Sequence, residues 1–103
     1  MSRNIDEDPD IVAEIRLLPS TKTRGIDSLV PWLGCPMEVG GQYFDCRISL
    51  AKGPLEPDNT ATVAIAFLSP ELVMDKLSVG TEFSLWEAKT IGHGKVVEIK
   101  RVI

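Results

Sequence analysis

The sequence predicts an all-β domain, either a small barrel or a sandwich, on three observations. Apolar and polar residues alternate along several short runs, which is typical of strands with one buried and one solvated face. Pairs rich in Gly and Pro separate these runs where turns are needed. Only one short segment has the features of a helix start. The 103 residues suit a single domain, and closing the sheet into a barrel would remove its exposed edges.

The first half of the chain contains three expected strands. Ile11–Leu18 carries an apolar residue at every second position, with Glu14 and Arg16 between them. Pro36–Val39 is a candidate for a short further strand. Tyr43–Leu50 alternates most clearly, with one face apolar and the other polar. Its apolar face comprises Phe44, Cys46, Ile48 and Leu50, and its polar face Tyr43, Asp45, Arg47 and Ser49.

The second half contains three more. Thr60–Leu68 is almost wholly apolar, so we expect it to be covered on both sides. Ser69 as a cap and Pro70 at the first position then predict one or two helical turns. Glu82–Glu87 alternates again, with Phe83 and Leu85 facing inward. Lys95–Ile103 is rich in Val and Ile and is expected to be the last strand.

Negative charge is concentrated near the N-terminus, and the net charge is −4. Residues 1–10 hold Asp6, Glu7, Asp8 and Asp10, and we expect them to form a mobile, solvated tail before a single barrel domain at residues 11–103. The net charge disfavours non-specific binding to nucleic acid or anionic membranes. With no apolar stretch that could span a bilayer, no export signal and two cysteines expected to be reduced, we expect a cytoplasmic protein.

The sequence contains no convincing catalytic or cofactor-binding motif. Gly92-His93-Gly94-Lys95 lacks the upstream Gly and the following Ser or Thr of a Walker loop, so no nucleotide is expected. Its glycines are expected to allow a close backbone approach or a bulge. Cys35, Cys46 and His93 are too few for a structural zinc site, so no metal is expected. Cys46 is expected in the core and Cys35 partly exposed; a Cys35–His93 nucleophile pair stays open without local support.

A partner-binding surface is the remaining possibility. The irregular stretch at residues 19–34 is longer than a barrel connection needs, and its charged residues precede an apolar run that includes Trp32. The alternative is that Trp32 plugs one end of the barrel. Trp86 should point away from the core, and the last hairpin adds further cations. The candidate partner-binding residues are Lys22, Arg24, Asp27, Trp32, Trp86, Lys89, His93 and Lys95.

The order of these features resembles the third, C-terminal β-barrel domain of elongation factor Tu and related translation GTPases. The resemblance covers about residues 10–100. The matching features include Gly80-Thr81-Glu82-Phe83-Ser84-Leu85-Trp86-Glu87 and Thr90-Ile91-Gly92-His93-Gly94-Lys95-Val96-Val97, and the resemblance is most specific from Phe83 to Val97. It implies a six-stranded closed antiparallel Greek-key barrel. It implies no GTP hydrolysis, because the GTPase domain and the middle barrel of that factor have no counterpart in these residues.

Together these features lead us to expect a non-enzymatic protein-interaction module that binds a protein partner. The resemblance suggests either a translation-related role or that of an antagonist, similar to an immunity protein. The alternative is a barrel that binds RNA or tRNA weakly through Lys22, Arg24, Lys89, His93 and Lys95. A small hydrolase or thiol enzyme that uses Cys35 and His93 is the third hypothesis, disfavoured by the poor inventory of catalytic residues. A fold alone decides among none of these.

Overall fold

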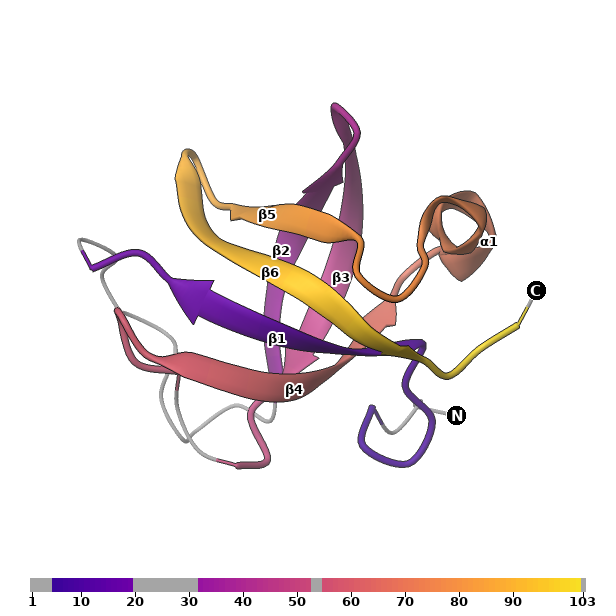
Figure 1. Ribbon diagram of the computed structural model, residues 1–103, viewed down its shortest axis with the longest axis horizontal. Helices are drawn as coiled ribbons and strands as arrows, with labels where there is room; N and C mark the ends of the chain where they lie inside the picture. The colour runs from indigo at the N-terminus through magenta and orange to yellow at the C-terminus, as the bar shows by residue number, and fades with distance from the viewer. Residues whose placement is uncertain (1–4, 20–31, 53–54, 103) are drawn as a thin grey trace.

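Six antiparallel strands close into a barrel, as predicted. The computed structural model describes residues 5–19, 32–52 and 55–102 (Figure 1). Neighbouring strands follow the order β1-β4-β3-β2-β5-β6, and β6 pairs with β1 to close the sheet. Because β1 lies beside β4 and not beside β2, the first four strands form a Greek key. The strands are β1 (Ile11–Leu17), β2 (Trp32–Val39), β3 (Gln42–Ser49), β4 (Thr60–Phe67), β5 (Glu82–Trp86) and β6 (Thr90–Ile99).

Tight hairpins join β2 to β3 and β5 to β6. β2 and β3 are joined at Gly40 and Gly41, whose φ angles of 58° and 84° suit the two central positions of a type I′ turn. β5 and β6 are joined around Ala88, which also has a positive φ, of 62°. The β5–β6 hairpin lies on the side of the barrel away from the short helix α1 (Pro70–Val73), and the tip of the β2–β3 hairpin lies between them at the top of the view (Figure 1).

β6 begins at Thr90, five residues before the predicted start, so that Gly92 and Gly94 lie inside the strand. It ends at Ile99, four residues before the predicted end at Ile103. A Cβ on Gly92 would lie 2.8 Å from the backbone oxygen of Arg16 on β1. A Cβ on Gly94 would lie 2.9 Å from Cγ2 of Ile15 and closer still to the ring of Phe83. The predicted close backbone approach is therefore confirmed at Gly92, whereas Gly94 leaves room for the side chains of Phe83 and Ile15. The two glycines bring β1, β5 and β6 together where the barrel closes.

The acidic segment before β1 differs from the solvated tail that was expected. Ile5 is buried, and Asp10 is completely buried. The carboxylate of Asp10 accepts a hydrogen bond from the backbone N–H of Phe67 at 2.7 Å and another from Nε of Arg101. Arg101 also pairs with Asp8 at 2.8 Å. The end of β4 and the residues after β6 lie beside the start of β1, so both partners reach Asp10 at the same end of the barrel and offset the cost of burying its charge.

The remaining elements largely follow the pattern of the sequence. The inward residues of all six strands form one core, and Cys46 belongs to it as predicted. The helix α1 starts at Pro70 as predicted and continues into a 3-10 turn, η1 (Met74–Lys76), but the Ser69 side chain forms no capping hydrogen bond. β2 starts at Trp32, four residues before the predicted Pro36. Within the described ranges, no helix has the length and apolar character needed to cross a membrane.

Candidate functional site: an aromatic face on the barrel wall

Both tryptophans and the single tyrosine of the chain lie exposed on one wall of the barrel. Trp32 is on β2, Tyr43 on β3 and Trp86 on β5, and these three strands are neighbours in the sheet. The alternation of each strand points the three side chains outward, since Met37, Cys46 and Leu85 fill the inward positions. We call the outward side chains of Trp32, Tyr43 and Trp86 the aromatic face.

At one end of this face, the ring of Trp32 is in contact with the guanidinium group of Arg47. The guanidinium carbon of Arg47 on β3 lies 4.2 Å from the ring centroid of Trp32, which is a cation–π contact. The indole folds over Gly34, where an added Cβ would lie 3.3 Å from the ring. Trp32 remains 37% exposed, so it is not the buried plug that one interpretation of the sequence predicted.

At the other end, Trp86 and Tyr43 contact each other. Their ring centroids are 5.7 Å apart with the planes at 67°, an edge-to-face arrangement. The pairing of Met37 with Leu85 and of Glu38 with Ser84 places Trp86 beside Pro36, and Pro36 pairs with Asp45 on its other side. Trp86 is 37% exposed and Tyr43 57%, so the pair presents both rings to solvent.

Beside this aromatic pair, Glu38 lies opposite Tyr43 and accepts the N–H of Gly41, and two further carboxylates lie nearby. Asp45 follows Tyr43 on the outward side of β3, and Glu87 follows Trp86 at the end of β5. Hydrogen bonding with Cys46 lowers the pKa of the Cys35 thiol, while burial and the charges of Glu87 and Asp45 act in the opposite direction. The negative charges of Asp45 and Glu87 thus both act on Cys35 in β2. Across the described ranges, neither carboxylate forms a hydrogen bond or an ion pair.

The other predicted partner-binding residues fall into two groups. Lys89, His93 and Lys95 are exposed on the β5–β6 hairpin, as expected. His93 lies opposite Ser84, with Nδ1 3.3 Å from its hydroxyl oxygen. Lys95 lies between Glu14 on β1 and Glu82 on β5, farther around the barrel from the aromatic face. Lys22, Arg24 and Asp27 lie outside the described residues.

The structure does not bring Cys35 and His93 together. Cys35 is buried, which corrects the expectation that it would be partly exposed, because the bend predicted at Gly34-Cys35-Pro36 is a continuous part of β2. Its side chain points into the barrel, while His93 points outward from β6, a strand that does not neighbour β2. Cys46 donates its thiol hydrogen to the Cys35 carbonyl oxygen at 3.2 Å. In the described part of the chain, no three His, Cys, Asp or Glu side chains are grouped to hold a metal ion.

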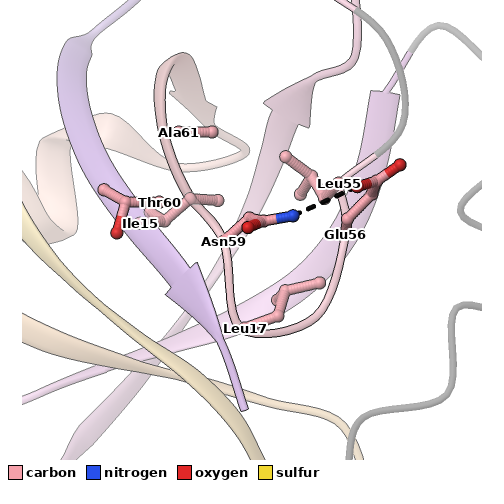
Figure 2. A pocket seen from close by; sticks show the side chains of 7 residues that line it. All are labelled: Ile15, Leu17, Leu55, Glu56, Asn59, Thr60 and Ala61. Atoms are coloured by element: carbon pink, nitrogen blue, oxygen red, sulfur yellow. Dashed lines mark hydrogen bonds between the residues drawn. The ribbon is translucent and has the colours of Figure 1, made fainter. Parts of the chain in front are cut away.

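A small hollow lies at the barrel end where β1 finishes and β4 begins (Figure 2). Its volume is about 190 Å³, and its walls are about equally polar and apolar. The one polar interaction drawn there is a hydrogen bond of 3.1 Å from Nδ2 of Asn59 to Oε2 of Glu56, so these two groups are already occupied with each other (Figure 2). The lining residues are Ile15, Leu17, Leu55, Glu56, Asn59, Thr60 and Ala61. We therefore place the candidate site on the aromatic face.

Sequence reasoning missed Tyr43, Asp45, Arg47 and Glu87 as site residues. The first three were assigned to the polar face of one strand, and the aromatic ring of Tyr43 on such a face is a signal that could have singled out that residue. Comparison of the chain with models of known protein families and with curated proteins finds no match.

Proposed function

We propose that this barrel is a non-enzymatic protein-interaction module that binds a protein partner through the aromatic face. The observation that carries the proposal is the exposure of Trp32, Tyr43 and Trp86 on three adjoining strands. Trp and Tyr supply much of the binding energy in protein interfaces, because they bury a large area while fixing few torsions. The likeness to the elongation factor Tu barrel adds an expectation of a translation-related or antagonist role in the cytoplasm.

The character of the face supports a protein partner better than RNA. Of the cations that the RNA alternative uses, Lys95 lies between two acids, Glu14 and Glu82. Asp45 and Glu87 beside the aromatic pair would repel a phosphate backbone. Exposed rings surrounded by charged and polar side chains are typical of a protein interface with an apolar centre and a polar rim.

Site-specific cross-linking tests the proposal. A photoreactive benzoylphenylalanine replaces Tyr43 in the full chain, and a matched variant carries it in place of Leu72, which is 58% exposed on α1. After irradiation in the native cell extract, the cross-linked protein is identified, purified and titrated against the unmodified barrel. We expect a defined product from position 43 and a saturable affinity for it that Trp86→Ala weakens by about tenfold or more.

The same experiment can contradict the proposal. A product from position 72 alone would move the partner to the helix side of the barrel. A second copy of this chain as the product would make the face a dimer interface, and an RNA product would favour the nucleic-acid alternative. Equal affinity of the purified partner for the unmodified barrel and Trp86→Ala would remove the aromatic face from the interaction.

A further inference from the structure

We infer that the partner presents an arginine side chain, which binds at the acidic aromatic cluster formed by Tyr43, Asp45, Trp86 and Glu87. This inference rests on the proposed function and specifies the chemistry of the partner. It starts from a difference between the two tryptophans of the aromatic face. Trp32 already has a guanidinium over its ring, at 4.2 Å, from Arg47. Over Trp86, the described residues place no cation, only the edge-to-face contact with Tyr43.

The charges around the two tryptophans also differ: a cation lies beside Trp32, and carboxylates lie beside Trp86. The cation beside Trp32 is supplied from β3 by Arg47, whereas two carboxylates, Asp45 and Glu87, flank the Tyr43–Trp86 pair. Neither carboxylate is paired with a described residue, and both influence Cys35 on the strand between them. A cationic side chain of a partner would therefore meet an aromatic ring and two negative charges that lack a counterion from the described part of the barrel.

Arginine fits this surface better than lysine. A planar guanidinium can stack on an indole and still direct N–H groups in its plane toward carboxylates on either side. The Arg47–Trp32 contact already places a guanidinium over an indole ring on the same wall. Pro36, which lies between Asp45 and Trp86, supplies a half-buried, apolar floor without a side-chain donor that would compete for the acids.

The probe is a synthetic capped peptide with two arginines separated by glycines, together with versions in which lysine or glutamate replaces arginine. Binding is followed by the ¹⁵N–¹H signals of the two indole N–H groups, which report Trp32 and Trp86 separately. We expect the arginine peptide to shift the Trp86 signal saturably and the Trp32 signal less. The lysine peptide should bind several-fold more weakly, and the glutamate peptide should leave both signals in place.

The acids are tested by the double variant Asp45→Asn, Glu87→Gln, and the matched control is Glu71→Gln, Asp75→Asn on the helix side, which removes the same charge. We expect the first to weaken binding of the arginine peptide about fivefold at low salt and the control to leave it unchanged. Equal weakening by both would reduce the effect to overall charge and overturn the inference. Equal binding of the lysine and arginine peptides would overturn the choice of arginine.

The outcome for the partner found by cross-linking separates the two proposals. If Trp86→Ala weakens its binding and the Asp45→Asn, Glu87→Gln variant does not, the partner-binding function stands and the arginine inference fails. If neither variant weakens it, both fail. Loss in both variants, with the helix-side control unchanged, supports the function and the arginine inference together.

Discussion

The carboxylate of Asp10 receives a hydrogen bond from the guanidinium of Arg101, and this contact joins the start of the first strand to the end of the last. The same carboxylate accepts the N–H of Phe67 at the end of β4. The backbone oxygen of Asp10 accepts the N–H groups of Lys100 and Arg101 at 2.9 and 3.1 Å. One buried acid thus ties together β1, β4 and β6, the three strands opposite the aromatic face in the strand order.

Replacing this acid should destabilise the whole barrel. Asp10→Ala leaves the buried N–H of Phe67 without its acceptor and Arg101 without its buried partner, so we expect the free energy of unfolding to fall by about 3 kcal/mol. Urea denaturation measures the change. Asp8→Asn is the control, because Asp8 is exposed, and we expect it to cost below about 1 kcal/mol. Similar losses in both variants would show that Asp10 has no special structural role.

The glycines of β6 provide a second test of the packing. Gly94→Ala adds a methyl group against the ring of Phe83 and should cost about 2 kcal/mol of stability. In a Phe83→Leu background the cost should shrink, since the ring that obstructs the methyl group is gone. Gly92→Ala should keep its full cost in that background, because its methyl group meets the backbone oxygen of Arg16. Thermal unfolding of the two glycine variants, of Phe83→Leu and of the two double variants checks this, and an unchanged cost for Gly94→Ala in the Phe83→Leu background would contradict it.

The buried thiol of Cys46 predicts a pH dependence. Its pKa is raised well above the ordinary thiol value, first by hydrogen bonding with Cys35 and then by burial. The folded protein therefore holds this proton more tightly than the unfolded chain. The stabilisation is fully present below the unfolded thiol pKa of about 8.5 and is lost as the pH rises toward the folded pKa. Unfolding between pH 7 and 10 should lose less stability in Cys46→Ala than in the unmodified protein; parallel curves would contradict this.

The partial exposure of Trp32 predicts that its replacement costs less stability than the replacement of a side chain buried in the barrel. Because the indole rests on the surface against Gly34 and Arg47, Trp32→Ala should cost about 1 kcal/mol, the scale of an exposed cation–π contact. A buried plug would cost about 3–5 kcal/mol on truncation. Met37→Ala, at a fully buried position of the same strand, sets the upper reference in the same denaturation series. A loss for Trp32→Ala as large as that for Met37→Ala would place the ring in the core.

Much of the fold could be predicted from residue alternation, because a strand with one buried face records that burial at every second position. This succeeded for β1, β3, β4 and β5, where the expected ranges differ from the observed ones by one residue at an end or both. It failed at the start of β6, where Gly92 and Gly94 read locally as a turn but are required by β1 and β5 on either side. That requirement depends on neighbours distant in the sequence.

The candidate site could be predicted only in part, for the same reason. The outward direction of Trp86 followed from the pattern of its own strand. Its contact with Tyr43 depends on how β5 pairs with β2 and β2 with β3, and the alternation within one strand does not contain this register. Arg47 over Trp32 likewise arises from pairing across two strands. Residues that form the face together were therefore recognised singly or not at all.

The most direct test of the central claim is the affinity of the purified partner for the double variant Tyr43→Ala, Trp86→Ala, measured by calorimetry. The control is Leu68→Ala, Leu72→Ala, which removes two exposed apolar side chains, one just before α1 and one within it. We predict that the aromatic double variant binds about thirtyfold more weakly while circular dichroism shows a folded barrel, and that the control binds like the unmodified protein. Unchanged affinity of the aromatic double variant, or an equal loss in the control, would contradict the assignment of partner binding to the aromatic face.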